Sequence, residues 1–307
     1  MRFSRLLLCT LAGCLLTGLA KAAEPAKRPN FVFIVSEDNS VHYLRLYGHK
    51  LGVTPNIERL AAEGLTFNHA FSGAPVCSVA RTTLATAMHA PRVGFQYHRK
   101  SAVASLPPGV KPWSTVLREQ GYYATNNSKT DYNFKVDMKQ AWDMSSRKAT
   151  WRNRPDKSMP FFHMQSFADS HESSLHFPMK QLEKPTTTLP AEVDLPPYFP
   201  DTPIMRYTMA RYYDRMRIID GHVGRIVNQL REDGLLENTF VFYFGDHGGV
   251  LPRSKGYAYE SGLHVPLVVR VPENFKQLVD HKRGSRTDGF VSFIDFGPTV
   301  LHLAGLK

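Results

Sequence analysis

Cysteine is scarce in this sequence, with three residues among 307. Cys9 and Cys14 lie in the apolar N-terminal stretch, so an exported and processed chain would keep only Cys77. A single cysteine excludes an internal disulfide, and a lone cysteine in an oxidising compartment is unusual unless it is buried or chemically committed. Before its neighbours are considered, Cys77 is best interpreted as a small buried hydrophobic side chain.

The sequence also lacks an apolar run suited to a membrane span, because the run from Leu6 to Leu19 is too short. It follows two arginines and precedes Ala20-Lys21-Ala22, the three-part pattern of a secretory signal peptide. We therefore predict a signal peptide over residues 1–22, a mature chain over 23–307, and a periplasmic or secreted protein without a stable membrane span. The alternative is a lipoprotein, since Leu11-Ala12-Gly13-Cys14 resembles a lipoprotein cleavage box; the apolar residues beyond it favour ordinary cleavage.

Basic residues interleaved with aromatic residues are absent as well, so nucleic acid is not an expected partner. The formal net charge is +11, part of which leaves with the predicted signal peptide. The remaining positive excess suits an anionic substrate, although net charge by itself indicates only non-specific attraction.

Apolar residues make up 42% of the chain, which is long enough to bury one large core. Short runs rich in β-branched and aromatic residues alternate with helical patterns, and no internal repeat or domain boundary interrupts them. Such runs are typical of strands buried on both faces of a mostly parallel sheet. The predicted fold is therefore α/β, with a large mostly parallel β-sheet sandwiched between helices. The predicted strands are Phe31–Val35, Tyr122–Thr125, Phe161–Phe167, Thr239–Phe244 and Val265–Val271.

Three helical patterns accompany these strands. Thr54-Pro55 predicts a helix that begins with a threonine cap and a first-turn proline and closes at Gly64. Apolar residues at spacings of three and four predict a long helix from about Met205 to Asp233, with its apolar stripe in the core. A last helix is expected around Phe296–Leu303, and the Pro- and Thr-rich segment 177–203 predicts a surface loop or lid.

Acidic residues follow two of the predicted strands. Glu37 and Asp38 come after the first strand, and Asp246 and His247 come after the strand Thr239–Phe244. Functional residues of open α/β sheets collect at the carboxyl ends of strands, although either cluster alone would more often be a helix cap or a solvated loop. Together, three carboxylates and an imidazole suit a hard divalent cation such as Ca²⁺ or Mg²⁺.

Cys77 opens the segment Cys77-Ser78-Val79-Ala80-Arg81, which leads into a helical pattern through Met88. A helix N-terminus favours negative charge, and Arg81 lies one turn further along the same face. The segment therefore indicates a site that handles an anion. The alternative is a buried cysteine beside a surface arginine.

The segment from Cys77 to Arg81 resembles the sulfatase motif, in which the cysteine is oxidised to formylglycine. Other segments resemble those of sulfatases in the same order: Arg28-Pro29-Asn30, Thr54-Pro55-Asn56-Ile57, Asp246-His247-Gly248, and Tyr259-Glu260-Ser261-Gly262 ahead of Val265-Pro266. The resemblance covers nearly all of the chain after the predicted signal peptide. It implies an alkaline-phosphatase-like fold and hydrolysis of sulfate esters or sulfamates, similar to bacterial enzymes that act on sulfated polysaccharides, such as heparan N-sulfatases.

Matching positions imply a role for individual residues. The implied ligands of Ca²⁺, or alternatively Mg²⁺, are Glu37, Asp38, the modified Cys77, Asp246 and His247. The implied cations that hold the sulfate are Arg81, Lys129 and Lys255. The implied acid that protonates the leaving oxygen is His171. Without the resemblance, both lysines and His171 would be interpreted as ordinary surface or loop residues. A sulfated carbohydrate substrate and a maturation enzyme that converts Cys77 are the implied partners.

The implied chemistry is consistent with these roles. A formylglycine hydrate offers two hydroxyl groups, and a metal ion lowers the pKa of one so that it attacks sulfur. The surrounding cations stabilise charge on the transferring group. Loss of the proton from the second hydroxyl then re-forms the aldehyde and expels sulfate.

Three positions depart from the family pattern. Val79 stands where proline or alanine is usual, Glu37 where aspartate is usual, and Asp131 where histidine is frequent. Relatives also continue past the position of Lys307 into a smaller C-terminal subdomain, so a truncated chain is expected.

Other functions stay open at this point. A phosphate or phosphonate ester hydrolase of the same superfamily would use the same metal and cations. An unmodified Cys77 would favour a non-enzymatic binder of sulfated glycans, and a truncated chain could also lack function altogether.

Overall fold

The computed structural model describes residues 28–100 and 105–306, so the predicted signal peptide lies outside the described residues. An eight-stranded sheet has the strand order β4-β3-β5-β1-β6-β7-β2-β8. Its strands are β1 (Asn30–Ser36), β2 (Gly64–Phe71), β3 (Tyr123–Asn127), β4 (Met144–Ser145), β5 (Phe161–Phe167), β6 (Thr239–Gly245), β7 (Leu267–Arg270) and β8 (Ser285–Ser292).

Helices connect and cover these strands. The α-helices are α1 (Pro55–Ala62), α2 (Cys77–Thr86), α3 (Ala90–Val93), α4 (Trp113–Glu119), α5 (Met138–Ala141), α6 (Pro203–Glu232), α7 (Glu260–Leu263) and α8 (Phe293–Leu303). Short 3₁₀ helices are η1 (Val41–Tyr43), η2 (Arg45–Tyr47), η3 (His98–Lys100), η4 (Trp151–Asn153), η5 (Glu172–Ser174), η6 (Met179–Glu183), η7 (Pro190–Glu192), η8 (Leu236–Asn238) and η9 (Glu273–Leu278). Among the described residues, no helix combines the length and the apolar character needed to cross a membrane.

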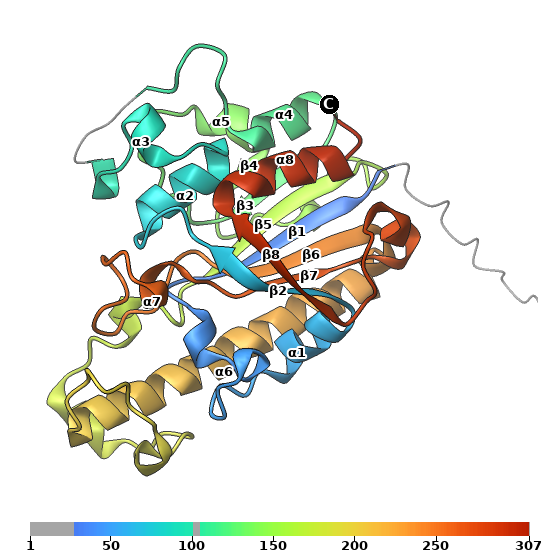
Figure 1. Cartoon of the computed structure of the whole chain (residues 1–307). Helices are drawn as coiled ribbons and strands as arrows, with labels where there is room; N and C mark the ends of the chain where they lie inside the picture. The colour runs from blue at the N-terminus through green and yellow to red at the C-terminus, as the bar shows by residue number, and fades with distance from the viewer. Residues whose placement is uncertain (1–27, 101–104, 307) are drawn as a thin grey trace, which may run out of the picture.

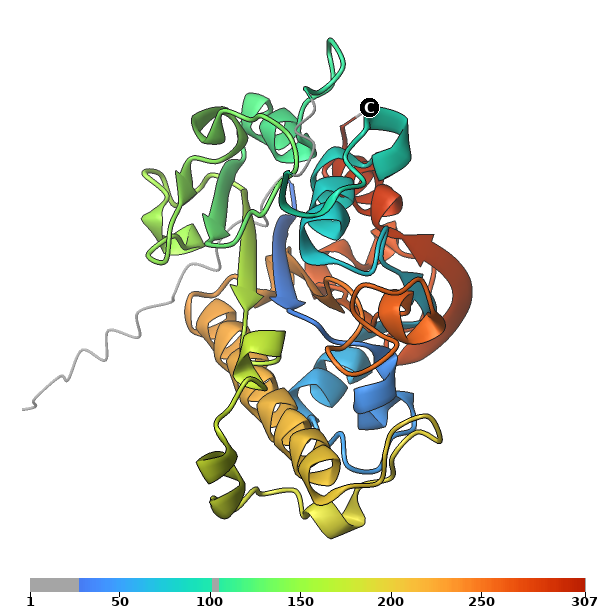
Figure 2. The same ribbon diagram turned by 90° about the vertical axis from the view of Figure 1, so that its left-hand side faces the viewer.

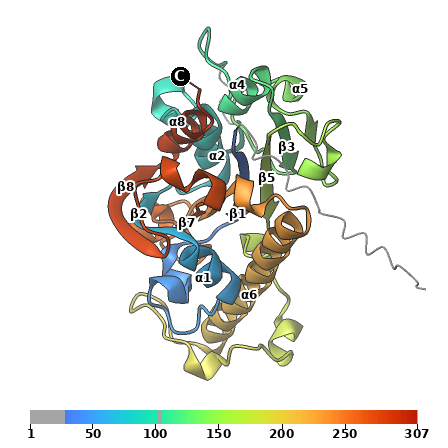
Figure 3. The same cartoon turned by 90° about the vertical axis from the view of Figure 1, so that its right-hand side faces the viewer.

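Both faces of the sheet are buried, because successive side chains of a strand point to opposite faces and those of the central strands are apolar. In β1, Phe31, Phe33 and Val35 pack in the core that includes α2, α4 and α8. Val32 and Ile34 pack in the opposite core, which includes α1 and α6. Figures 1 and 3 show these two helical layers on either side of the sheet. The predicted α/β sandwich is confirmed.

The sheet is mostly parallel, as predicted, with one exception. β1 lies between β5 and β6 and is parallel to both, whereas β7 is antiparallel to β6 and β2. The prediction that Val265–Val271 forms a strand is confirmed for Leu267–Arg270. Residues 246–266 connect β6 to β7 and contain the four-residue helix α7.

The predicted helices are present, but the start of α1 is held differently from the prediction. Thr54 occupies the cap position, yet its hydroxyl donates to the Gly52 carbonyl at 3.4 Å and caps no helix N–H group. The helix also ends before Gly64, which opens β2. The long helix α6 agrees closely with the predicted range, and segment 177–203 carries 3₁₀ turns between longer irregular stretches.

Candidate functional site

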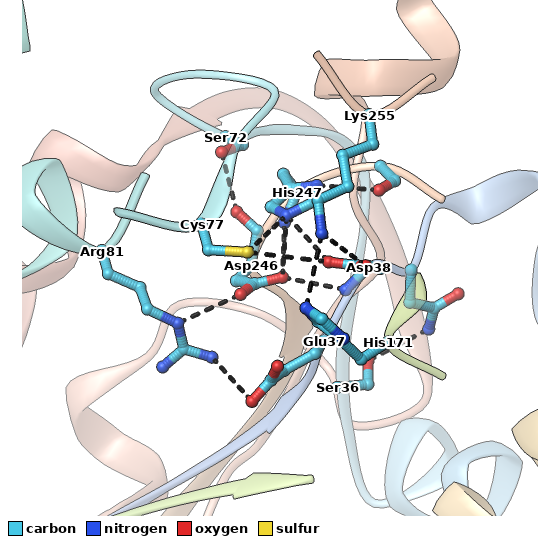
Figure 4. A network of polar contacts seen from close by, with 12 residues as sticks. Ser36, Glu37, Asp38, Ser72, Cys77, Arg81, His171, Asp246, His247 and Lys255 are labelled. Atoms are coloured by element: carbon cyan, nitrogen blue, oxygen red, sulfur yellow. Dashed lines mark hydrogen bonds and ion pairs between the residues drawn. The ribbon is translucent and has the colours of Figure 1, made fainter. Parts of the chain in front are cut away.

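The candidate site lies at the carboxyl edge of the three central strands. In the sheet register, Ser36 of β1 pairs with Phe167 of β5 on one side and with Gly245 of β6 on the other. The residues that directly follow these strands are therefore brought together. Figure 4 shows the resulting network, which gathers eight of the nine predicted site residues as labelled sticks: Glu37, Asp38, Cys77, Arg81, His171, Asp246, His247 and Lys255.

Cys77 is the first residue of α2 and lies at the centre of this network. Its Sγ is 3.2 Å from His247 Nε2 and 3.8 Å from Asp38 Oδ1. His247 Nε2 is in turn 2.9 Å from Asp38 Oδ1, and all three residues are fully buried. A carboxylate, an imidazole and a thiol therefore converge from the segments after β1 and β6 and from the start of α2.

Asp246 holds the acidic segments in register. Its Oδ1 accepts the backbone N–H groups of Asp38 and of His247, each at 3.0 Å. Its Oδ2 accepts from Arg81 Nε at 3.1 Å. Arg81 is 2% exposed, and its Nη2 has no hydrogen-bond partner among the described residues. This buried donor is suited to an oxyanion, because a buried N–H group without a partner is energetically costly.

Lys129 and Glu37 form an ion pair next to Arg81. Lys129 Nζ is 2.6 Å from Glu37 Oε2, and Arg81 Nη2 lies 3.8 Å from Glu37 Oε1. Arg81 Nη1 also donates to Ser166 Oγ of β5 at 3.0 Å. The Glu37 carboxylate therefore faces two cations that the sequence assigned to the sulfate.

Lys255 and His171 approach Cys77 from the opposite side. Lys255 Nζ is 2.8 Å from Asp38 Oδ2 and 3.5 Å from His171 Nε2. His171 makes a hydrogen bond with Cys77, and this bond raises the pKa of the His171 imidazole despite partial burial. The structure thus brings together all nine residues that the sequence singled out.

Burial disfavours the charged form of each side chain in the site, but hydrogen bonds and neighbouring charges outweigh this effect for Cys77, His247 and Asp38. Burial raises the pKa of the Cys77 thiol, but hydrogen bonds to His171 and His247 lower it to about 7. Burial lowers the pKa of His247, but Asp246 and Asp38 raise it to about 10. The pKa of Asp38 stays well below its usual range despite burial, because His247 bonds to its carboxylate. When no metal ion is bound, a protonated His247 therefore neutralises charge on the buried carboxylates of Asp38 and Asp246.

These donors fit a divalent cation. One ligand atom each from Asp38, Cys77 and His247 lies within 4.8 Å of the others, and Asp246 Oδ1 is 3.8 Å from His247 Nε2. The anionic surroundings that favour a proton on His247 would equally favour a metal ion with neutral imidazole as ligand. Glu37, the fifth predicted ligand, instead has its carboxylate against Lys129.

Several supporting residues were not identified from the sequence. Three hydroxyls donate to backbone carbonyls of the acidic segments: Tyr212 to Asp38, Ser170 to Glu37 and Ser72 to Asp246. The sequence placed Tyr212 in the core stripe of α6 and gave neither serine a site role. No local pattern could have found them, because each contact joins residues more than 130 positions apart.

Asp131, where the family resemblance led us to expect histidine, lies beside the site rather than in the network around Cys77. Its Oδ1 is 3.9 Å from Arg99 Nε, and its backbone has a positive φ of 50°. Its Oδ2 is buried and has no hydrogen-bond partner in residues 28–100 and 105–306.

Residues 29–306 match the family model described as Sulfatase. An ulvan-active sulfatase of Formosa agariphila is 35% identical over 323 residues, covering 92% of this chain and 53% of that protein. The human N-sulphoglucosamine sulphohydrolase is 25% identical, covering 95% and 64%, so the chain spans about half to two thirds of these relatives. The crystal structure of a phosphonate monoester hydrolase of Agrobacterium radiobacter superposes with a TM-score of 0.71 at 19% identity, covering 91% and 74%, which shows the fold alone.

Proposed function

The chain belongs to the sulfatase family, and from the geometry of its site we propose that it hydrolyses sulfate esters or sulfamates of sulfated glycans. The observation that carries the proposal is the position of Cys77, buried at the first residue of α2 between His171 and His247. The helix N-terminus and the nearby Arg81 favour negative charge at this point. An anion bound there would meet cations on several sides.

Cys77 is proposed to be converted to formylglycine by a maturation enzyme, as the family motif implies. The modified residue would supply a hydroxyl nucleophile in place of the thiol. His247 and His171 are the imidazoles within hydrogen-bond reach of the side chain at this position, and His171, which is outside the proposed metal-ligand set, would hold a proton near the nucleophile. Arg81, Lys129 and Lys255 would bind the sulfate oxygens and stabilise charge on them.

A divalent cation, Ca²⁺ or Mg²⁺, is proposed to be held by Asp38, Asp246, His247 and the modified residue 77. When bound, it would supply positive charge that lowers the pKa of the nucleophilic hydroxyl. Glu37 belongs to the same proposed ligand set, and its contact with Lys129 would also orient that lysine toward the sulfate.

His171 is proposed as the acid that protonates the leaving oxygen or nitrogen. The backbone N–H of Ser173 donates to His171 Nδ1 at 3.2 Å, so the neutral ring carries its hydrogen on Nε2. That nitrogen is the one facing Lys255 and the site. His171 is therefore oriented to deliver a proton toward a group bound above Cys77.

The proposed substrates are sulfated polysaccharides outside the cytoplasm. Relatives named for ulvan and for N-sulphoglucosamine support a sulfated glycan as the substrate class. The predicted signal peptide supports a periplasmic or secreted location.

A phosphate or phosphonate ester hydrolase is the second candidate. The fold is shared with a phosphonate monoester hydrolase, and the cations around Cys77 would also bind a phosphoryl group. A non-enzymatic glycan binder is the third candidate if Cys77 remains a thiol.

The test is to produce the chain together with a formylglycine-generating enzyme and to measure the mass of the Cys77 peptide and turnover of three aryl esters. Conversion lowers the peptide mass, and we expect a higher kcat/KM for the aryl sulfate than for the phosphate or the phosphonate. The Cys77→Ala variant is the control for background hydrolysis. Active protein with an unmodified thiol would refute the formylglycine proposal, and a preference for either phosphorus ester would establish the second candidate.

A further inference from the structure

A cleft of about 680 Å³ lies beside the candidate active site, and most of its lining residues have no role in the chemistry proposed above. His163 and Gln165 of β5 line it, together with segment 147–152 and with Arg225, Ile226 and Gln229 of α6. In Figure 2, β5 passes between the segment around β3 and β4 and the long helix α6. Protein cavities of this size commonly bind organic ligands larger than a single small ion.

The lining of this cleft is strongly basic. Glu37 is the single carboxylate side chain among the lining residues, against five cations: Lys129, Arg147, Lys148, Arg152 and Arg225. Lys129 is paired with Glu37 and Arg152 with Asp233. Within the described part of the chain, Arg147, Lys148 and Arg225 have no carboxylate at ion-pair distance. The cleft therefore presents positive charge that no internal counterion neutralises.

The basic residues stand on segments fixed to the sheet and to α6. Asn127 Nδ2, at the end of β3, donates to the carbonyls of Arg147 at 3.0 Å and Ala149 at 3.2 Å. These two bonds hold the backbone that carries Arg147 and Lys148. A rigid backbone lowers the entropy that a bound ligand must overcome to order its contacts.

Arg225 is positioned from the other wall. Its Nη2 lies 2.6 Å from His222 Nδ1, and the His222 ring stacks on Phe167 of β5 at 4.3 Å between centroids. His222 Nε2 is also 3.1 Å from Asp169 Oδ2. Arg225 is thus oriented by a chain of contacts that reaches the carboxyl end of β5.

The cleft is continuous with the candidate active site. Glu37, Lys129 and Ser166 line the cleft, and the same three residues contact each other or Arg81 in the site. A chain molecule whose cleaved sulfate lay at Cys77 would therefore place a neighbouring sugar over this basic surface.

We propose that this cleft binds sulfate groups on a sugar next to the one that is cleaved, so that the substrate is a polysaccharide with sulfates on neighbouring residues. The inference rests on the proposed sulfatase function of the adjacent site. Arginine forms paired N–H bonds to oxyanions, and Gln165 can bond to sugar hydroxyls. Singly sulfated sugars would leave these groups unused.

The experiment measures binding of a fluorescein-labelled dextran sulfate oligosaccharide by anisotropy at constant ionic strength. Two cleft variants, Arg147→Ala/Lys148→Ala and Arg225→Gln, change different walls. Lys276→Ala/Lys282→Ala removes two exposed cations outside the cleft lining and serves as the control; it removes as many charges as the double cleft variant and one more than Arg225→Gln. We expect each cleft variant to weaken binding about tenfold or more, since charge-assisted contacts to the anion are lost, and the control to change it by less than about twofold.

Equal weakening in the control would show general attraction to net charge and overturn the proposal, as would unchanged binding in both cleft variants. Carboxymethyl dextran of the same length tests sulfate specificity, and binding as tight as that of dextran sulfate would overturn it too. Thermal unfolding checks that the variants fold. If one cleft variant does not fold, the binding measured with the other cleft variant tests the proposal. Binding needs no conversion of Cys77, so absence of turnover would count against the proposed function and leave this result intact.

Discussion

Asp220, in the middle of α6, binds the start of α1 through Asn56. Its Oδ1 accepts the backbone N–H groups of Asn56 and Ile57, each at 2.9 Å, and its Oδ2 accepts from Asn56 Nδ2 at 2.7 Å. Asp220 is 3% exposed, so these bonds are made away from water. A carboxylate at a helix N-terminus satisfies free N–H groups and interacts favourably with the helix dipole.

Asp220→Ala should lower the free energy of unfolding by about 2–4 kcal/mol, because one buried and one half-buried backbone donor lose a charged acceptor. Urea denaturation at neutral pH measures the change. Glu58→Ala is the control on the same helix, since its partly exposed ion pair with Arg45 should contribute less than about 1 kcal/mol. Equal losses in the two variants would show that Asp220 contributes no more than a surface ion pair.

The same contact shows where sequence reasoning succeeds and where it fails. Thr54-Pro55 correctly predicts that a helix begins there, because the backbone preferences are local. It does not predict the capping group, because Asp220 lies 164 residues away from Asn56 and is brought close by packing of α6 on α1. Caps supplied from another element leave no pattern at the helix itself.

The strands of the sheet were also predicted only in part. Central strands such as β1 and β6 were predicted because burial on both faces requires continuous apolar runs. β8 was missed because its sequence, Ser-Arg-Thr-Asp-Gly-Phe-Val-Ser, is largely polar and lies at the edge of the sheet. β2 was missed because Gly64 was interpreted only as the end of the preceding helix.

The candidate site was predictable for two different reasons. Glu37, Asp38, Asp246 and His247 follow strand ends, so physical reasoning alone grouped them. Lys129, His171 and Lys255 stand in irregular segments, and only the family resemblance distinguished them from surface residues. Their contacts depend on loop conformations that no periodicity encodes.

Removal of metal should abolish turnover and lower the melting temperature, since a cation that binds the folded protein stabilises it. Asp38→Asn should lose the metal as well, because a hard cation loses both a charge and a ligand oxygen. Metal content of the purified proteins, with and without chelator, is the measurement. Asp280→Asn, at an exposed position, is the control. Full metal occupancy in Asp38→Asn would place the metal elsewhere.

His171→Ala should slow the hydrolysis of sugar sulfates far more than that of an activated aryl sulfate. A sugar alkoxide needs protonation as it leaves, whereas a phenolate needs little help, and general acid catalysis is worth about 10²–10⁴-fold. The ratio of kcat/KM for the two substrates is the measurement, in a chain extended to the length of its relatives. The exposed His281, replaced by Ala, is the control. Equal losses on both substrates would instead indicate a structural or binding role for His171.

His163 should make the stability of the protein depend on pH below about 6.5. It is 1% exposed in β5, with Nδ1 2.8 Å from Thr125 Oγ1, and burial lowers the pKa of its imidazole from 6.5 to about 4. Above pH 6.5 neither the folded nor the unfolded chain protonates this residue, so it adds no pH dependence. As the pH falls toward 4, the unfolded chain binds a proton that the folded protein excludes, and the free energy of unfolding decreases. A span of about 2.5 pH units at about 1.4 kcal/mol per unit gives about 3 kcal/mol.

His163→Gln keeps a polar group near Thr125 but cannot titrate, so its stability relative to the unmodified protein should rise by about 3 kcal/mol between pH 7 and pH 4. Urea denaturation of both proteins at the two pH values measures this difference, in which the other titrating groups cancel. A constant difference would mean that His163 is protonated as readily in the folded protein as in the unfolded chain.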